Sequence, residues 1–233
     1  MNNFDFNWDD PIKPNRPKKT YTDRRGAALD NMFYFIEPGD NEWGIPDTKP
    51  FTEDLSGIEW ISFWDKSKIS NNFKDPYVWE NIGIHFYVED FQFQIIWNDP
   101  DKWLPFLKMC RAVVAPDFSV YTDMLKAHQL WNAFRRQWCA KYWQDNGVNI
   151  VSCVTWSIGK TDDWYIYGIP QNTSIATSFV GKTIDKPQAI KDFKVLVDKL
   201  NPHKIFIKCS DTDERELRKH FEFDKIRVAS WYI

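Results

Sequence analysis

Polar side chains follow several short apolar runs of this sequence, and Asp117 is the most informative of them. Pro116 stiffens the chain just before Asp117, and Ser119 lies two residues later. A carboxylate in this place can act as a general base, a nucleophile or a hydrogen-bond acceptor. The alternative is a turn in which Asp117 and Ser119 satisfy backbone amides ahead of the next helix. The residues themselves leave both interpretations open.

Asp90 is the second candidate catalytic carboxylate. With Asp117 it would form a two-carboxylate site of the kind that performs acid and base chemistry at a glycosidic bond. The alternative is a helix cap for the segment that begins at Phe91. A carboxylate pair is also compatible with Mg²⁺, whereas His85 and His128 lack the partners that a zinc site needs. The sequence therefore predicts no dedicated metal site and leaves the cofactor open.

Six further residues are predicted to bind substrate. Asn132 and Arg135 share one edge of an expected helix with Arg136, where one guanidinium would reach a rim carboxylate or an anionic ligand, or else form a surface ion pair. Trp156, expected where a strand ends, is the candidate for stacking on a base or sugar, with a place in the core as the alternative. The other three are hydroxyl side chains at expected strand ends: Ser119, Ser178 and Ser210.

Alternating strands and helices would have to position these side chains. Because the ligand face of a parallel sheet lies at the carboxyl ends of its strands, residues that follow the strands should converge there. The most regular helix repeats apolar residues from Met124 to Tyr142, with Thr122 or Asp123 as its cap and Gly147 at its end. Shorter helices are expected over 91–97, 100–109 and 187–200. The expected strands are 58–64, 82–88, 112–115, 149–156, 174–180, 204–209 and 226–232.

This alternation predicts an α/β fold of repeating strand-helix units. A complete or partial TIM-like barrel is favoured over an open doubly wound sheet, because the strands are evenly spaced and no Gly-rich nucleotide loop opens the chain. The sequence also lacks the GxGxxG, P-loop, HExxH and GxSxG motifs, which disfavours dehydrogenases, P-loop enzymes, zincins and elbow-type serine hydrolases.

The chain of 233 residues is expected to form one domain over residues 31–233, preceded by a basic, proline-rich arm over residues 1–30. A net charge of −3 gives no global attraction for nucleic acid, so any such contact would run through the arm, which is otherwise a solvated tail. No apolar run approaches the ~20 residues of a membrane span, and the cysteines form no CxxC pair. We expect a cytoplasmic protein; a homodimer through exposed Trp residues is compatible with the composition.

A set of short motifs in a fixed order resembles the domain of unknown function 4417 family. They are Gly44-Ile45-Pro46, Trp97-Asn98-Asp99-Pro100, the segment from Ala115 to Tyr121, Gln129-Leu130-Trp131-Asn132 with Arg135, and the segment from Gly168 to Asn172. The resemblance spans roughly residues 44–210. It implies an origin in a bacteriophage or mobile element, and it implies no activity.

Two functions follow as hypotheses. The first is an enzyme of hydrolase or glycosyl-transfer type, acting on a nucleotide, nucleic acid or phosphorylated substrate at the strand ends. The second is a non-enzymatic protein that binds a host or phage protein, or nucleic acid, in host takeover or defence evasion. Phage origin favours both by association alone.

Overall fold

The computed structural model describes residues 36–65, 80–182 and 185–227. Its strands form one parallel sheet in which every strand pairs with the next one in the sequence. This confirms the predicted α/β class, and the sequential order differs from the reversal of strand order that defines a doubly wound sheet. The strands are β1 (Glu59–Ser62), β2 (Ile82–His85), β3 (Ala112–Val114), β4 (Ile150–Cys153), β5 (Ser174–Ser178), β6 (Lys204–Lys208) and β7 (Asp224–Lys225).

The sheet curls into a partial barrel. Trp60 of β1 contacts Phe206 of β6 with ring centroids 5.5 Å apart, although these strands are not neighbours in the sheet. Gly83 of β2 makes room for the indole, since a Cβ atom there would lie 2.5 Å from the Trp60 ring. The described strands include no pairing of β7 with β1, so the sheet is curled but the barrel is not closed by backbone hydrogen bonds.

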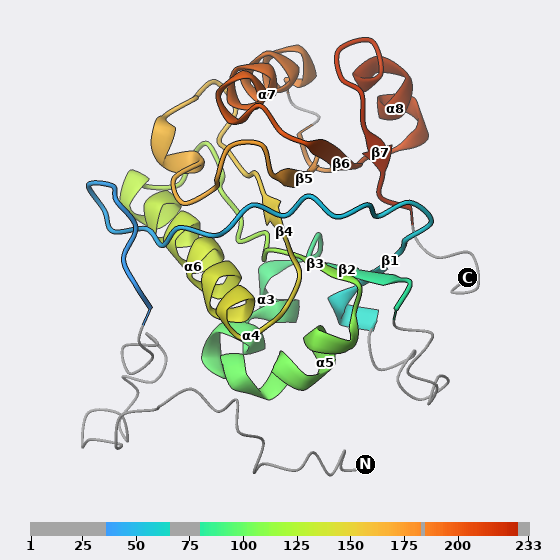
Figure 1. Cartoon of the computed structure of the whole chain (residues 1–233). Helices are drawn as coiled ribbons and strands as arrows, with labels where there is room; N and C mark the ends of the chain where they lie inside the picture. The colour runs from blue at the N-terminus through green and yellow to red at the C-terminus, as the bar shows by residue number, and fades with distance from the viewer. Residues whose placement is uncertain (1–35, 66–79, 183–184, 228–233) are drawn as a thin grey trace.

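Helices cover the outer face of the curled sheet (Figure 1). Helices α7 and α8 lie beside β5, β6 and β7, while α3, α4 and α5 lie beside β1, β2 and β3. The bounds are α3 (Asp90–Phe93), α4 (Ile95–Asn98), α5 (Leu104–Met109), α6 (Lys126–Asp145), α7 (Lys186–Leu200) and α8 (Asp211–Leu217), with 3-10 turns η3 (Phe63–Asp65), η4 (Pro100–Trp103) and η5 (Asp163–Tyr165). None of the helices in the described ranges has the length and apolar composition of a bilayer-spanning helix.

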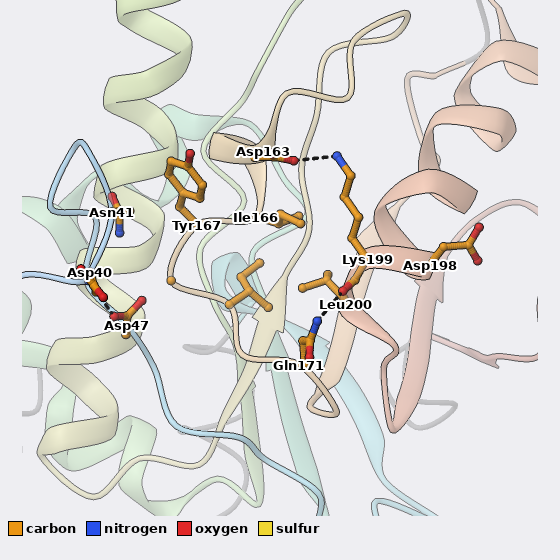
Figure 2. A pocket seen from close by; sticks show the side chains of 12 residues that line it. Asp40, Asn41, Asp47, Asp163, Ile166, Tyr167, Gln171, Asp198, Lys199 and Leu200 are labelled. Atoms are coloured by element: carbon orange, nitrogen blue, oxygen red, sulfur yellow. Dashed lines mark hydrogen bonds and ion pairs between the residues drawn. The ribbon is translucent and has the colours of Figure 1, made fainter.

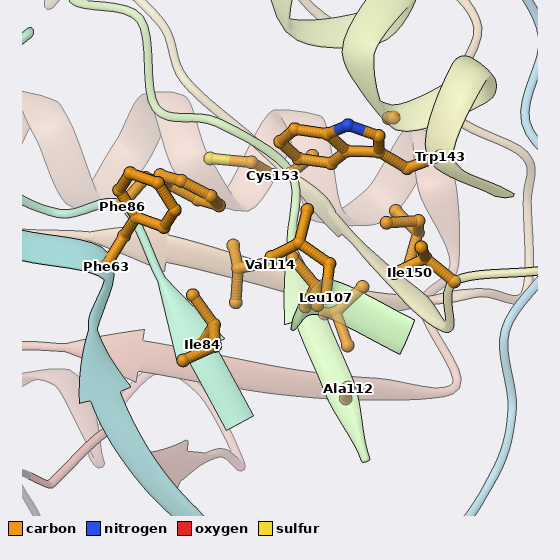
Figure 3. Packing of buried hydrophobic residues seen from close by; sticks show 14 of the residues in the cluster. Phe63, Ile84, Phe86, Leu107, Ala112, Val114, Trp143, Ile150 and Cys153 are labelled. Atoms are coloured by element: carbon orange, nitrogen blue, oxygen red, sulfur yellow. The ribbon is translucent and has the colours of Figure 1, made fainter. Parts of the chain in front are cut away.

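Aromatic rings fill the space between the helices and the first strands. Phe63 lies 4.9 Å from Phe86, and Phe86 stacks at 5.7 Å on Trp143 of α6. Figure 3 shows these rings above Ile84 of β2 and Ile150 of β4. Side chains of this size each remove about 150 to 250 Å² from water, so the cluster fixes α6 firmly against the sheet.

Several predicted element boundaries were wrong. Neither Thr122 nor Asp123 caps α6: its N-cap is Leu125, and the Gln129 amide instead donates to the carbonyls of Tyr121 and Met124, which holds the preceding turn from inside the helix. The helix expected over 91–97 is divided between α3 and α4, because the chain turns at Gln94. The last strand is Asp224–Lys225, earlier than expected, and residues 228–233 lie outside the described ranges.

A segment that we call the strap, residues 48–55, crosses the amino ends of the strands (Figure 1). Thr48 donates to the Gly168 carbonyl through both its amide and its hydroxyl. Phe51 pairs with the start of β5, since its amide donates to Thr173 Oγ1 at 2.9 Å and its carbonyl accepts from the Ser174 amide at 2.7 Å. The strap covers the amino end, and it leaves the carboxyl ends of the strands as the place for a site.

Candidate functional site at the strand carboxyl ends

The inner face of the curled sheet changes from apolar to polar along the strands. Paired residues of parallel strands point to the same side, so the register places Gly83, Ala176 and Phe206 on the same inner face as Trp60. Two residues further along each strand, the same face carries polar side chains. They are Ser62, His85, Ser178 and Lys208, while Cys153 of β4 pairs with Ala176 on the same face.

Asp117 lies just beyond the end of β3, as predicted. The Thr155 hydroxyl donates to Asp117 Oδ1 at 2.5 Å, and the Cys153 thiol lies 3.6 Å from the same oxygen. Burial raises the pKa of the Asp117 carboxyl, and the charge of Asp90 adds to that rise, while the Thr155 hydrogen bond and Lys182 oppose it. Asp117 is therefore a carboxyl group that is tuned toward the protonated form.

Two buried cations, Arg136 and Lys182, act electrostatically on Asp117. Arg136 of α6 has a guanidinium that is 1% exposed, and its Nη2 donates to the Tyr165 carbonyl at 2.6 Å. Lys182 follows β5, donates to the Trp156 carbonyl at 3.0 Å and lies 4.0 Å from the centroid of the Trp156 ring. Burial lowers the pKa of both side chains, and the Asp117 carboxylate opposes that shift in each case. Both cations consequently act on one carboxyl group.

A row of neutral groups runs from Asp117 toward β2. The Tyr87 hydroxyl lies 3.9 Å from Cys153 Sγ, and the Tyr87 ring stacks on His85 at 5.5 Å. Burial lowers the pKa of His85 to about 3, so the imidazole is uncharged at neutral pH. Because Nδ1 accepts from the Tyr87 amide at 3.3 Å, the proton sits on Nε2, which has no acceptor among the described residues. Burial also raises the pKa of the Cys153 thiol to about 12.

Asp90 and Ser119, both predicted site residues, contact each other. Asp90 accepts a hydrogen bond from the Ser119 hydroxyl at 2.7 Å and from the Ser119 amide at 3.1 Å and 3.2 Å. Asn132 Nδ2 donates to the Ser119 carbonyl at 2.6 Å, and Arg135 Nη2 donates to Asn132 Oδ1 at 2.5 Å. The structure thus brings four predicted residues into one network beside Asp117.

Arg135 and Trp156 lie in packed surroundings. The Arg135 guanidinium stacks on the Phe118 ring at 4.0 Å, and its Nη1 donates to Gln94 Oε1 at 3.0 Å. The Trp156 ring is fully buried and stacks at 5.2 Å on Phe193 of α7. Trp156 therefore lies in the core, as the alternative interpretation had it. The cation on its ring is the Lys182 ammonium.

Ser178 and Ser210 are separate from each other. Ser178 is one of the inner-face hydroxyls at the end of β5, and its Oγ accepts from the Val180 amide at 3.2 Å. Ser210 is the N-cap of α8, where its hydroxyl accepts from the Asp213 amide at 3.1 Å and donates to the Asp213 carboxylate at 2.8 Å. Ser178 therefore lies on the inner face of the sheet with Cys153, which contacts Asp117. Ser210 caps the amino end of α8.

Comparison with known proteins decides the family. Residues 37–224 match the family described as a domain of unknown function, DUF4417. The chain belongs to the DUF4417 family. This confirms the resemblance that the short motifs indicated.

Two phage proteins are similar to this DUF4417 chain in sequence. The Gene 1 protein of Mycobacterium phage L5 is 32% identical over 146 residues, which cover 59% of this chain and 64% of the L5 protein. The Gene 1 protein of Mycobacterium phage D29 is 25% identical over 191 residues, covering 78% of this chain and 68% of the D29 protein. The chain thus spans a little under two thirds of the L5 relative. No solved structure matches the sequence.

A separate hollow of about 710 Å³ in this DUF4417 domain lies away from the strand carboxyl ends (Figure 2). Asp40 and Asp47 line it from the segment before the strap, Tyr167 and Gln171 from the connection before β5, and Lys199 from the end of α7. Asp163 pairs with Lys199 at 2.6 Å. The connection from β4 to β5 has no α-helix among its described residues, so the hollow lies where a covering helix would pack in a regular βα unit.

Sequence reasoning missed three of the residues around Asp117 in the DUF4417 fold: Tyr87, Thr155 and Lys182. The spacing from Cys153 to Thr155 is the usable signal, because alternate residues of a strand share a face. Arg136 was grouped with Arg135, and nothing local separates two adjacent arginines. Among the described residues, no group of three or more His, Cys, Asp or Glu side chains is placed to hold a metal ion.

Proposed function

We propose that the protein is an enzyme that acts at the carboxyl ends of its strands by hydrolysis or glycosyl transfer, on a nucleotide, nucleic acid or other phosphorylated substrate. The observation that carries the proposal is the setting of Asp117: a buried carboxyl group with a raised pKa that accepts a 2.5 Å hydrogen bond from Thr155 and on which the charges of Arg136 and Lys182 act. A carboxyl group with a raised pKa is suited to hold and return a proton near neutral pH.

Asp90 is the second carboxylate of the proposal. Its charge contributes to the raised pKa of Asp117, while its own oxygens are held by the Ser119 amide and hydroxyl. Two carboxylates in such different environments can divide the roles of acid and base between them. In this mechanism Asp117 exchanges the proton with the substrate, and Asp90 supplies the nearby negative charge.

The experiment combines a ligand screen with a turnover assay. Wild type and Asp117→Asn are tested by thermal shift against nucleotides, nucleosides, sugar phosphates and short nucleic acids, because a ligand that binds the folded state raises the melting temperature. Each stabilising ligand is then assayed for turnover. We expect Asp117→Asn to retain the fold and to lose about 10²- to 10⁴-fold in rate, the usual contribution of a general acid or base. Full turnover by Asp117→Asn would refute the proposal.

A second function, binding of a partner protein, is supported by exposed apolar side chains beside the same network. Phe91 of α3 is 75% exposed, Leu125 at the start of α6 is 70% exposed, and Tyr121 between Ser119 and α6 is 55% exposed. Exposed apolar side chains occur at interaction sites, and Phe91 and Tyr121 lie within two residues of Asp90 and Ser119 in the sequence. The basic arm, proposed as a second contact for a host or phage protein or nucleic acid, lies outside the described residues.

The partner-binding function is tested by pull-down from lysate of infected cells. Under this function, Phe91→Asp with Leu125→Asp, or deletion of residues 1–30, removes a captured protein that Asp117→Asn still captures. If Asp117→Asn loses the captured protein while the double variant and the deletion both keep it, the result would favour the enzyme function. Added salt weakens a contact made through the arm, because exposed charges are screened within about 10 Å at 0.1 M salt.

A further inference from the structure

Arg136 is a buried cation with unused hydrogen-bonding capacity. Its side chain is 1% exposed, and only Nη2 has a partner, the Tyr165 carbonyl. Nε and Nη1 have no acceptor among the described residues, and no carboxylate in those ranges lies within ion-pair distance of Arg136. Buried guanidinium groups are normally paired, since an unpaired buried charge costs several kcal/mol. The site is therefore incomplete without an acceptor.

Lys182 adds a second cation at the same place. The ammonium is held by the Trp156 carbonyl and the face of the Trp156 ring, which leaves its other donors free of any carboxylate in the described ranges. Lys182 is held to the carbonyl of Trp156, the residue after Thr155, whose hydroxyl holds Asp117, and the charge of Asp117 acts on Lys182 and on Arg136. The position of Lys182 depends on Trp156, which is itself fixed by its stack on Phe193.

The charges at this spot do not balance. Arg136 and Lys182 both act on Asp117, whose pKa is raised by burial, and the neighbouring Cys153 thiol and His85 imidazole are neutral at neutral pH. The Asp192 carboxylate also acts on Lys182, but its oxygens accept from the Gly159 amide and the Gln188 side chain, so it pairs with neither cation. The side chains of His85 and Tyr87 bring further uncharged hydrogen-bonding groups to the same lining. An anion with more than one charge and several acceptor oxygens would complete this set of donors, and a phosphate group has both properties.

We infer that the strand-end cluster binds a phosphate group of its ligand through Arg136 and Lys182, beside Asp117. The inference rests on the proposed function for the identity of the reacting group, and it deepens that function by naming the substrate group that is held. Trp156 is then a positioning residue that acts through Lys182. The anion contact that was expected at Arg135 is now proposed for Arg136. The Arg135 guanidinium already contacts Phe118, Gln94 and Asn132.

The test measures binding of inorganic phosphate and pyrophosphate by isothermal titration calorimetry. Arg136→Met and Lys182→Met each remove one cation at similar volume, and Lys141→Met is the matched control, because Lys141 lies on the same helix in an exposed pair with Asp145. We expect each site variant to bind about 10- to 100-fold more weakly than wild type, the value of one charged hydrogen-bonding contact. The control should bind as wild type does.

Folding and turnover are kept separate from this test. Arg136 has no carboxylate within ion-pair distance in the described ranges, so Arg136→Met breaks no ion pair, but it removes the donor to the Tyr165 carbonyl, and its melting temperature is measured to check that it folds. If it does not fold, Lys182→Met decides, because Lys182 is half-buried and lies outside the helices and strands. Asp117→Asn should still bind phosphate even though it has lost turnover.

Three results would overturn the inference. Wild type binds neither anion at millimolar concentration, or folded Arg136→Met and Lys182→Met bind as wild type does, or Lys141→Met weakens binding as much as they do. Phosphate binding that requires both cations, together with full turnover by Asp117→Asn, would retain the phosphate site and refute the proposed role of Asp117.

Discussion

The Thr155 hydroxyl donates a 2.5 Å hydrogen bond to Asp117, although the two residues follow different strands of the sheet. Thr155 lies two residues beyond β4 and Asp117 three residues beyond β3. This bond fixes one carboxylate oxygen and opposes, without cancelling, the effect of burial on the pKa. The Thr155 hydroxyl thus holds Asp117 in a defined position, while burial disfavours the ionised carboxylate. The free energy of unfolding should therefore depend on the ionisation of Asp117.

Asp117→Asn should stabilise the fold in a manner that depends on pH. The amide oxygen of Asn can still accept from Thr155, whereas the buried charge is gone. Because the folded pKa of Asp117 lies above the unfolded value of 3.8, wild type loses stability as pH rises from that value through the folded pKa. Urea denaturation should show the variant more stable than wild type at pH 8, with the difference shrinking by pH 4. An equal difference in stability between variant and wild type at pH 8 and pH 4 would contradict a raised pKa of Asp117.

His85 should make the protein sensitive to acid. Its pKa is lowered by burial from 6.5 to about 3, so the unfolded chain binds a proton below pH 6.5 that the folded protein rejects. Stability from this group is complete above pH 6.5 and is lost as pH falls toward 3, by about 2 kcal/mol between pH 7 and pH 5.

The His85 prediction is checked by denaturation of His85→Gln and of a surface control, His220→Gln. His85→Gln should flatten the pH dependence between 7 and 5, and His220→Gln should keep the slope of wild type, since His220 is an exposed side chain three residues beyond α8. A wild-type slope in His85→Gln would show that another group carries the acid sensitivity.

Gly168→Ala should destabilise the protein strongly. Gly168 has φ +75°, and a Cβ atom there would lie 2.1 Å from the Pro46 carbonyl oxygen, where the chain approaches the strap. Strain and a backbone clash together should cost at least about 3 kcal/mol. Gly159→Ala is the control, because Gly159 has φ +81° with open space around it and should cost only about 1 to 2 kcal/mol. Thermal denaturation that ranks the two variants equally would contradict the close approach.

Asp90→Asn and Asp90→Ala should separate the structural and chemical roles of Asp90. Asn keeps an acceptor for the Ser119 amide, so Asp90→Asn should lie within about 1 kcal/mol of wild type, whereas Asp90→Ala loses every bond to Ser119 and should cost about 1.5 to 3 kcal/mol. If Asp90 also acts with Asp117, Asp90→Asn loses turnover while it keeps stability. Unchanged turnover in Asp90→Asn would restrict Asp90 to holding Ser119.

Much of the fold could be predicted from the sequence because apolar runs and turn residues mark buried strands locally. The helix over 187–200 was predicted within one residue, since its apolar stripe and flanking residues are local signals. The short α8 was missed: its seven residues repeat no apolar stripe, and the Ser210 and Asp213 cap was its only signal. The start of α6 was misplaced because Gln129, from within the helix, holds the preceding turn.

The site could be predicted only in part, because it depends on the curl of the sheet and the rotation of α6. The position of Asp117 after a strand was predicted from the sequence, and it lies three residues beyond β3. Arg135 and Arg136 are neighbours in sequence, yet one stacks on Phe118 near the surface and the other is fully buried near Asp117. The contact of Trp60 with Phe206 joins non-neighbouring strands, so no local sequence pattern predicts it.

The contacts of the strap can form only late in synthesis of the chain. Thr48 and Phe51 leave the ribosome long before their partners, which lie 120 and 122 residues further along the chain. Contacts of such separation form late, because a long loop must close before they contribute. A nascent chain that ends before residue 168 therefore carries a strap without a binding place, and its apolar Phe51 and Leu55 stay uncovered until β5 emerges. Slow translation over this interval should expose the chain to aggregation or to chaperones.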